Sequence, residues 1–322
     1  MIEEQTREFA EIFTAIRGEI QKRVVGLEDV IDHAINALFL GGHVLLEGVP
    51  GLGKTLLVKT LAEALDLTFS RVQFTPDLMP ADIVGTNIIV ETAGQKTFRF
   101  QKGPVFTHIL LADEINRATP KTQSALLESM QEKSVTVGGE IRNLEEPFCV
   151  LATENPIEME GTYPLPEAQV DRFLYKLIVP SPEEKELISI LNLTTTEALP
   201  VIRTVATREK IREFLHFIPQ VPAADAVVAF AAQLILRTHP EHSDAPDLVR
   251  KYIRYGSSPR GAQALILSAK IRALRDGRYH IARQDILSEV LPCLRHRLIL
   301  NIEGQAEDVS TDTILKELIT TN

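Results

Sequence analysis

Short apolar runs alternate with longer amphipathic segments along the first part of the chain. Five of these runs have the length of strands and end in polar or turn-forming residues. They are HVLLEG (43–48), TFSRVQF (68–74), HILLADE (108–114), FCVLATEN (148–155) and YKLIVP (175–180). Between them, residues 54–65 and 121–131 repeat apolar side chains at the spacing of one helix face. Strands that alternate with helices predict a mostly parallel sheet covered on both faces.

Two stretches interrupt this alternation, and both predict hairpins. Residues 82–104 alternate apolar and polar positions on either side of AGQ (93–95). Residues 134–148 contain a Gly-Gly pair between alternating segments, which is another hairpin signal. We expect both segments to project from the sheet as insertions.

Helical spacing precedes the first predicted strand and follows the last one. Residues 3–38 fit two helices with a turn at Gly26. Ser181 and Pro182 predict the start of another helix, and strand signals fade after it. Five further helices are predicted, at 211–218, 223–238, 246–254, 259–275 and 283–300. We therefore expect an α/β core over 1–200 and a small helical domain over 201–322.

The composition is that of a globular protein and limits the choice of partners. Hydrophobic residues make up 44% of the chain, and 34 basic against 44 acidic residues give a net charge of −10. Such an acidic chain is unsuited to general binding of nucleic acid phosphates. The acidic start is unlike a signal peptide, and the longest apolar run (226–236) is too short for a membrane span of about 20 residues. With two distant cysteines and no CxxC spacing, these features favour a reducing cytoplasm.

The stretch GVPGLGKT (48–55) lies between the first predicted strand and a predicted helix. It fits the pattern G-x-x-x-x-G-K-[ST], in which glycines allow backbone N–H groups to surround phosphate oxygens. We expect Lys54 to reach the β and γ phosphates of a nucleotide, and the Thr55 hydroxyl to bind Mg²⁺. The predicted nucleotide contacts in this loop and helix start are Gly48, Val49, Pro50, Gly51, Leu52, Gly53, Lys54, Thr55 and Leu56.

Polar residues end two further predicted strands. We expect Asp113 to hold Mg²⁺, usually through water, and Glu114 to orient and deprotonate an attacking water, which favours hydrolysis. The alternative is that this pair only caps the next helix. Asn155 ends the run LATEN, where its amide would hold the lytic water or the γ-phosphate. The simpler interpretation of Asn155 is a loop residue before Pro156.

Several longer strings resemble MoxR-family AAA+ ATPases. They are QFTPDLMPADIVG (73–85), DEINRATPKTQSALLESMQE (113–132), ATENPIEMEGTYPLPEAQVDRF (152–173) and SSPRGAQAL (257–265). The resemblance extends from about residue 20 to residue 300. It implies an AAA+ P-loop core with a five-stranded parallel sheet and a small all-α C-terminal lid. In that family the two insertions match the helix-2 insert and the hairpin before sensor 1.

The resemblance also implies roles that spacing alone does not show. Asn155 matches sensor 1, and Arg172 in VDRF matches an arginine finger that reaches the nucleotide of the neighbouring subunit. Arg260 in SSPRG matches sensor 2 at the start of a lid helix, and Val25 and Gly26 match the segment that packs against adenine.

Simpler interpretations stay open for the arginines. Arg172 would otherwise be a surface residue paired with Asp171 or Glu167, and Arg260 an ordinary helix-start residue. Arg117 in DEINRA fits a subunit interface and an exposed helix surface equally well. Gly261 stands where relatives often have Ala, so we expect a slightly looser helix start there.

The implied function is Mg²⁺-dependent ATP hydrolysis by a homo-oligomer, most simply a hexameric ring. In this family the activity drives chaperone-like remodelling or maturation of partner proteins, including cofactor insertion, often with a protein that carries a von Willebrand factor A domain. A nucleic-acid motor related to helicases is the alternative, because the resemblance implies helicase-like insertions. Lys96, Arg99 and Lys102 of the first insertion fit this alternative. The second insertion, with three Glu and one Arg, argues against it. A nucleotide-gated scaffold without turnover would not need Glu114.

Overall fold

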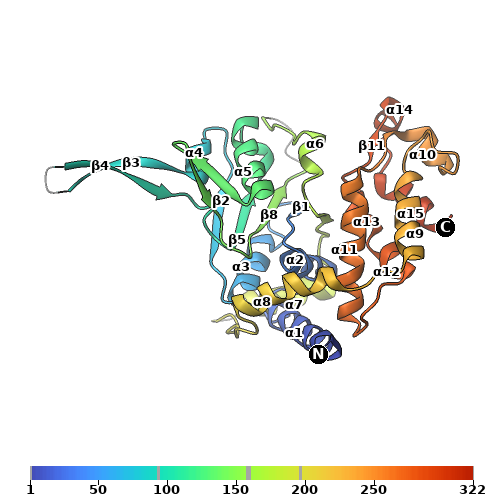
Figure 1. Cartoon of the computed structure of the whole chain (residues 1–322), viewed down its shortest axis with the longest axis horizontal. Coiled ribbons are helices and arrows are strands. Elements are labelled where there is room, and N and C mark those ends of the chain that lie inside the picture. Colours follow the sequence, from blue (N-terminus) through green and yellow to red (C-terminus); the bar gives the residue numbers. More distant parts are fainter. Residues whose placement is uncertain (1, 93–94, 157–160, 196–197, 322) are drawn as a thin grey trace. The chain divides into compact units, whose positions relative to one another are not determined.

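The computed structural model describes residues 2–92, 95–156, 161–195 and 198–321 (Figure 1). The chain forms two compact units. The first, here called the sheet unit, comprises Ile16–Leu165 and Leu177–Arg212. The second, the helical unit, comprises Met1–Ala15, Pro166–Lys176 and Glu213–Asn322. Each unit draws on separated segments, whereas the domain limits expected from the sequence are 1–200 and 201–322, which stay a prediction.

A five-stranded sheet forms the centre of the sheet unit, in the order β2-β5-β8-β1-β9. The neighbouring pairs β2–β5, β5–β8 and β8–β1 are parallel. The strands are β1 (Val44–Glu47), β2 (Phe69–Gln73), β5 (Ile109–Asp113), β8 (Cys149–Glu154) and β9 (Tyr175–Ile178). All five coincide with the predicted apolar runs, which confirms the predicted α/β class.

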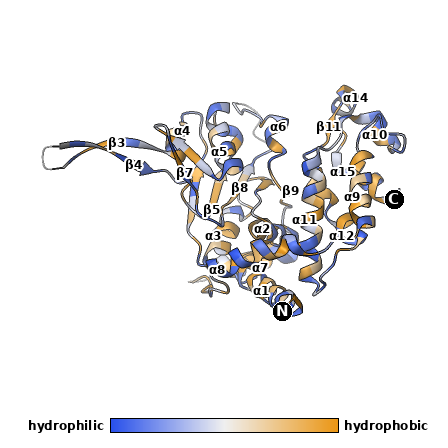
Figure 2. Ribbon diagram, in the orientation of Figure 1, coloured by the Kyte–Doolittle hydropathy of each residue, from blue (hydrophilic) through white to orange (hydrophobic). Residues whose placement is uncertain are grey.

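The middle of the sheet is apolar because helices cover it. Side chains of β1, β5 and β8 are almost all buried, and their hydrophobic character stands out in Figure 2. Helices α2 (Glu28–Leu40) and α3 (Lys54–Ala64) contact β8 and β5. Each fully buried Val, Leu or Ile side chain contributes roughly 1.5–3 kcal/mol relative to exposure. Burial therefore explains why these strands appear in the sequence as continuous apolar runs.

Both predicted hairpins are present. In the first, β3 (Gly85–Thr92) pairs antiparallel with β4 (Gln95–Lys102), and the ribbon extends well away from the sheet (Figure 1). Its expected turn falls on residues 93–94, which lie outside the described residues. In the second, β6 (Ser134–Val137) pairs with β7 (Glu140–Asn143). Gly138 and Gly139 form its turn with φ of 62° and 82°, a backbone region that favours glycine.

Helix α7 of the sheet unit begins two residues later than the sequence indicated. Its bounds are Glu184–Thr194 and its N-cap is Glu183, so the predicted start at Ser181 is wrong. The backbone N–H of Glu183 donates to Glu186 Oε2 at 2.8 Å. This bond satisfies a backbone donor at the helix start, as in a capping box, and fixes the start of the helix at Glu183. The other helical segments outside the helical unit are α4 (Pro80–Val84), η1 (Ile115–Arg117) and α5 (Pro120–Glu132).

The helical unit is built around α11 (Pro259–Arg275), which contacts several other helices of the unit. Leu265, Ile271 and Leu274 of α11 are fully buried there. The described segments in or entering this unit are α1 (Ile2–Gln21), α6 (Glu167–Val170), α8 (Arg208–Phe217), η2 (Ile218–Gln220), α9 (Asp225–Leu236), α10 (Asp247–Tyr252), β10 (Ile253–Tyr255), α12 (Arg283–Ser288), α13 (Val290–Leu294), β11 (Ile299–Leu300), α14 (Ile302–Ala306) and α15 (Thr311–Thr320). The predicted helical C-terminal part is confirmed.

Two details of this unit differ from the sequence prediction. The helix expected over 283–300 is divided into α12 and α13, with Glu289 between them. Pro292 lacks the N–H that a continuous helix would need there. The following residues form β11, which pairs antiparallel with β10, so a small sheet stands where only helices were expected. Strands of two and three residues are too short to leave a periodic pattern in the sequence.

The first residues of the chain pack in the helical unit. Phe9 meets Phe214 edge-on, with ring centroids 5.1 Å apart, and the Arg275 guanidinium lies over the ring of Phe13. Phe9, Phe13 and Phe214 are all buried. These contacts explain why Met1–Ala15 belongs to the same unit as residues beyond 212.

Among the described residues, no single helix is long and apolar enough to cross a membrane. The segments Arg208–Gln220 and Asp225–Leu236, bent by 91°, meet the length and composition test only as a pair.

Candidate nucleotide site

The glycine loop leads from β1 into α3, as its sequence context predicted. Gly51 and Gly53 have φ of 86° and 77°, so both need the left-handed backbone that glycine adopts without strain. Gly48 lies close to Val179, the residue after β9, because a Cβ atom on Gly48 would be 3.0 Å from the Cβ of Val179. The loop ends at the N-terminus of an 11-residue helix, where free N–H groups and the helix dipole favour an anion.

Lys54 begins α3 and lies partly buried in the loop. Its Nζ donates to the carbonyl oxygen of Gly48 at 2.6 Å. Burial lowers the pKa of Lys54, and the nearby Asp113 and Glu114 act in the opposite direction. An ammonium group close to two carboxylates and a glycine loop is suited to bind a polyphosphate.

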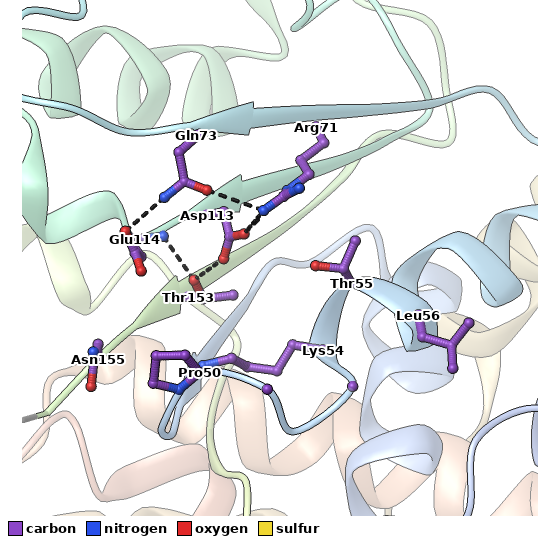
Figure 3. Close-up of a pocket in the computed structure, with 12 residues that line it drawn as sticks. Pro50, Lys54, Thr55, Leu56, Arg71, Gln73, Asp113, Glu114, Thr153 and Asn155 are labelled. Atoms are coloured by element: carbon purple, nitrogen blue, oxygen red, sulfur yellow. Dashed lines mark hydrogen bonds and ion pairs between the residues drawn. The ribbon is translucent and has the colours of Figure 1, made fainter. Parts of the chain in front are cut away.

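Asp113 is the last residue of β5 and Glu114 follows it, at the carboxyl edge of the sheet (Figure 3). Thr153 of β8 joins them, because its Oγ1 donates to Asp113 Oδ1 at 2.7 Å and accepts from the backbone N–H of Glu114 at 2.8 Å. Glu114 has φ of 55°, an unusual value for a residue other than glycine. The interpretation of the two acids as a simple helix cap does not account for these contacts.

Two residues of β2 complete the cluster, and sequence reasoning missed both. The guanidinium of Arg71 donates to Asp113 Oδ2 at 2.7 and 3.1 Å and to Gln73 Oε1 at 3.1 Å. Gln73 Nε2 in turn donates to Glu114 Oε2 at 2.6 Å. The signal was present as polar residues at the end of TFSRVQF, but only the pairing of Gln73 with Asp113 in the sheet brings them to the acids.

Arg117 also contacts this cluster. Its Nη1 donates to Glu114 Oε2 at 2.8 Å, and its side chain is 44% exposed. The structure thus gives Arg117 a contact to Glu114. Whether Arg117 lies at a subunit interface or on an exposed helix surface stays open, as in the sequence analysis.

A cavity of about 390 Å³ brings most of the predicted residues together. Asn155 is 6% exposed and lies on its wall, directly after β8. The other lining residues come from the glycine loop, β2, β5 and β8: Pro50, Gly51, Gly53, Lys54, Thr55, Leu56, Arg71, Gln73, Asp113, Glu114 and Thr153. Figure 3 shows the acids and the glycine loop facing one another. Gly48 and Val49 precede this wall in the loop.

A second cavity, of about 240 Å³, adjoins the same loop and is mostly apolar. It shares Gly51, Gly53 and Leu56 with the first cavity, and Leu52 also lines it. The predicted adenine segment contributes Val25, and Gly26 lies between Val25 and the lining residue Leu27. The remaining wall comes from Arg23, Val24, Pro180, Pro182, Glu186, Leu187, Ile190, Leu193 and Thr194.

Arg172 and Arg260 belong to the helical unit, where Ser258 connects the segments that carry them. Ser258 Oγ donates to Asp171 Oδ2 at 2.9 Å and accepts from the backbone N–H of Arg260 at 3.2 Å. The nearly buried Arg297 donates to Asp171 Oδ1 at 2.9 Å. Asp171 is therefore engaged with Ser258 and Arg297, and the alternative interpretation of Arg172 as a surface residue paired with Asp171 or Glu167 stays open.

Three further contacts hold the segment that carries Arg172. Arg297 donates to the backbone carbonyl oxygens of residues 171, 173 and 174.

At Gly261, next to Arg260, a Cβ atom would lie 2.1 Å from Ser257 Oγ. The absence of a side chain at Gly261 thus permits close packing at the start of α11. The sequence prediction named only a slightly looser helix start and did not include this close packing.

The residues of the first cavity fit a magnesium nucleotide. Thr55 and Asp113 offer hard oxygen ligands of the kind that Mg²⁺ prefers. Among the described residues there is no group of three or more His, Cys, Asp or Glu suited to hold a metal. Mg²⁺ is typically bound by few protein oxygens, with phosphates and water completing its octahedron.

Fold and site together define an ATPase of the AAA+ class. Residues 43–175 match the model for the ATPase family associated with various cellular activities (AAA), and residues 246–318 match the AAA lid domain. The protein named Chaperone MoxR1 of Mycobacterium tuberculosis is 40% identical, over 97% of this chain and 82% of its own. Protein MoxR of Methylorubrum extorquens is 32% identical, over 88% and 86%. The chain therefore belongs to the MoxR family of AAA+ ATPases.

A solved structure supports the same conclusion. A protein of Cytophaga hutchinsonii, provisionally described as an ATPase, is 38% identical and superposes with a TM-score of 0.92. The match covers 99% of this chain and 96% of the other. The predicted AAA+ core and helical lid are thus confirmed, and nucleotide binding follows from the family.

Proposed function

We propose that this protein hydrolyses Mg²⁺-ATP and uses the energy to remodel partner proteins in the cytoplasm. The observation that carries the proposal is the pair Asp113 and Glu114 beside the glycine loop, on one cavity with Lys54 and Thr55. In this proposal Lys54 binds the β and γ phosphates, and Thr55 and Asp113 hold Mg²⁺. The metal would neutralise charge that develops on the transferred phosphoryl group.

Glu114 is proposed as the general base. Its Oε2 accepts from Gln73 and Arg117, and no donor from the described part of the chain reaches Oε1. One oxygen is thus held in place while the other is available to take a proton from water. Asn155 is proposed to position that water or the γ-phosphate, as sensor 1.

The test of this mechanism is the Glu114→Gln variant. We expect turnover of ATP to fall by about 10²–10⁴-fold, because the base is lost, while ATP still binds. Steady-state hydrolysis and binding of labelled ATP measure the two effects, and chelation of Mg²⁺ in the wild type should stop turnover. Glu132→Gln, an exposed position on α5, is the matched control. Unchanged turnover in Glu114→Gln would contradict the mechanism.

The proposal extends to an assembly. Arg172 is proposed to act on the nucleotide of a neighbouring subunit, as an arginine finger. Arg260 is proposed as sensor 2, a lid residue that couples the phosphate state of the nucleotide to the position of the lid. A site shared between two copies requires a head-to-tail interface, which closes most simply as a ring, here proposed as a hexamer. The support is the family membership together with the hydrogen bond that joins Asp171, next to Arg172, to Ser258, at the start of the helix that carries Arg260.

Protein clients, and a partner with a von Willebrand factor A domain, are proposed from the family. The name of the M. tuberculosis relative describes a chaperone, which agrees with such a role. The Glu114→Gln variant with ATP should retain its clients long enough for affinity capture and identification. Capture that is equal with ADP would argue against an ATP-dependent client complex.

A nucleic-acid motor is the second candidate, supported by one observation. The hairpin β3–β4 carries Lys96, Arg99 and Lys102, and its Phe98 side chain is 78% exposed. Exposed aromatic and basic groups can bind single-stranded nucleic acid. Stimulation of ATP turnover by DNA that disappears at high salt would favour this candidate over protein remodelling.

A further inference from the structure

The apolar cavity beside the glycine loop contains one acidic side chain. Of the residues that line it, only Glu186 carries a carboxylate. Glu186 lies in the first turn of α7 and is partly buried. Arg23 and Thr194 also line the cavity, and its other side chains are apolar. A carboxylate in such a mostly apolar cavity imposes a requirement for a hydrogen-bond donor on whatever the cavity binds.

Backbone contacts fix the position of this carboxylate. Glu186 Oε2 accepts from the backbone N–H of Glu183 at 2.8 Å, and no donor among the residues described reaches Oε1. Oε1 lies so close to Gly26 that a Cβ atom there would be 2.4 Å away. Gly26 also has φ of 68°. The glycine thus leaves the space that Glu186 occupies, beside the segment that carries Val25.

The place of the cavity indicates which part of a nucleotide it would receive. It shares Gly51, Gly53 and Leu56 with the cavity of the phosphate-binding loop. A nucleotide with its phosphates on that loop would extend its base toward the apolar walls, where a flat ring loses contact with water. The polar edge of the base then has to match Glu186.

We propose that Glu186 selects a 6-aminopurine, which deepens the proposed function and rests on it. Oε1 accepts a hydrogen bond from the exocyclic amine of adenine. A purine with an oxygen at position 6, such as guanine or hypoxanthine, would instead present lone pairs to Oε1 at that position, because its ring N–H donor lies one ring position away, at nitrogen 1. A buried acceptor without a donor costs free energy, so such bases are rejected.

The test compares binding of ATP and inosine triphosphate, which differ at position 6 and its adjoining ring nitrogen, to the full-length protein. Calorimetric titrations give both dissociation constants for the wild type and for Glu186→Gln. The glutamine amide keeps the size of the side chain and an oxygen for the helix cap, and it adds a donor for an oxygen at position 6. We expect the preference for ATP to fall by about tenfold or more, with tighter binding of inosine triphosphate in the variant.

Glu184→Gln is the control, because Glu184 lies on the same helix, is exposed and does not line the cavity. Its preference should equal that of the wild type. Thermal unfolding of the variants shows whether α7 remains intact, and Glu186→Ala adds a case in which the acceptor is removed without a new donor. In that variant ATP should bind more weakly, while inosine triphosphate should not.

The outcomes separate this proposal from the proposed function. If the wild type binds ATP and inosine triphosphate equally, or Glu186→Gln leaves the preference unchanged, Glu186 is not the selecting residue although ATP binding stands. If the wild type binds neither nucleotide, the proposed function fails, and this proposal fails with it.

Discussion

At the scale of single residues, the hydroxyl of Thr153 forms hydrogen bonds to both Asp113 and Glu114. It donates to the carboxylate of Asp113 and accepts from the backbone of Glu114, so one side chain orients both acids. Thr153 is 1% exposed. Water therefore has little access to replace these bonds if the hydroxyl is removed.

The Thr153→Val variant tests this role. Valine has nearly the same shape but no hydroxyl, so the backbone N–H of Glu114 and one oxygen of Asp113 each lose a partner. We expect the free energy of unfolding to fall by about 1–3 kcal/mol. ATP turnover should fall more than ATP binding, because the acids act in the chemical step. Denaturant unfolding and steady-state kinetics measure the two effects.

Thr122→Val is a suitable control for that experiment. Thr122 is also buried, and its hydroxyl donates to the carbonyl oxygen of Leu78, away from both acids. A loss of stability without a selective loss of turnover is expected there. If both variants reduce turnover alike, Thr153 has only a general structural role.

At the scale of elements, the sequence predicted strands well where burial is two-sided. β1, β5 and β8 lie inside the sheet and are apolar along their length, so their positions follow from composition. β2 is at the sheet edge and half exposed, and it carries Arg71 and Gln73 among its few apolar residues. The sequence could not show that these two side chains reach Asp113 and Glu114, because strand order is a tertiary property.

The same limit applies to the helical unit. Individual helices were visible as periodic patterns, whereas the β10–β11 pair was not. The contact of Asp171 with Ser258 and Arg297 joins positions that are far apart in the chain. Such contacts depend on packing between distant segments. The sequence could therefore indicate Arg172 and Arg260 as candidate residues, but it could not show which side chains hold their segments in place.

A buried histidine next to β1 makes the free energy of unfolding depend on pH. His43, just before β1, is buried between α5 and β8; its Nε2 bonds the carbonyl oxygen of Met130, and its Nδ1 accepts from the N–H of Val150. Burial lowers the pKa of His43 to about 4, with a smaller effect from Lys133. The unfolded chain, with an ordinary histidine pKa near 6.5, takes up this proton first as pH falls.

We therefore expect His43 to reduce stability as pH falls from about 6.5 to about 4, by roughly 3 kcal/mol in total. The His43→Gln variant lacks this titration, so its free energy of unfolding should depend less steeply on pH in that range. Urea unfolding at several pH values measures the slopes. His280→Gln, at an exposed histidine, should keep the slope of the wild type. Equal slopes for the wild type and His43→Gln would contradict the prediction.

At the scale of the whole molecule, the proposed ring predicts complementation between defective subunits. Arg172→Ala should lose turnover by about 10³-fold or more, because its neighbour lacks the arginine finger. Lys54→Met should also be inactive. In a 1:1 mixture half of the subunits keep Lys54, and about half of their neighbours keep Arg172, so about a quarter of sites should recover.

Steady-state ATP turnover of the mixture measures this recovery. Arg254→Ala, at an exposed arginine of the same unit, should remain active without mixing. Differently tagged subunits show by co-purification whether mixed oligomers form. Mixed oligomers without recovered turnover would exclude a site shared in this way.

The interleaving of the two units has a consequence for work with fragments. The chain passes between the units at 15–16, 165–166, 176–177 and 212–213. A C-terminal piece cloned from residue 201 would omit Phe9, which packs on Phe214, and Asp171, which neutralises the nearly buried Arg297. A buried arginine without its carboxylate is strongly destabilising. The lid as an isolated recombinant fragment should therefore be insoluble or unfolded unless residues Met1–Ala15 and Pro166–Lys176 are supplied with it.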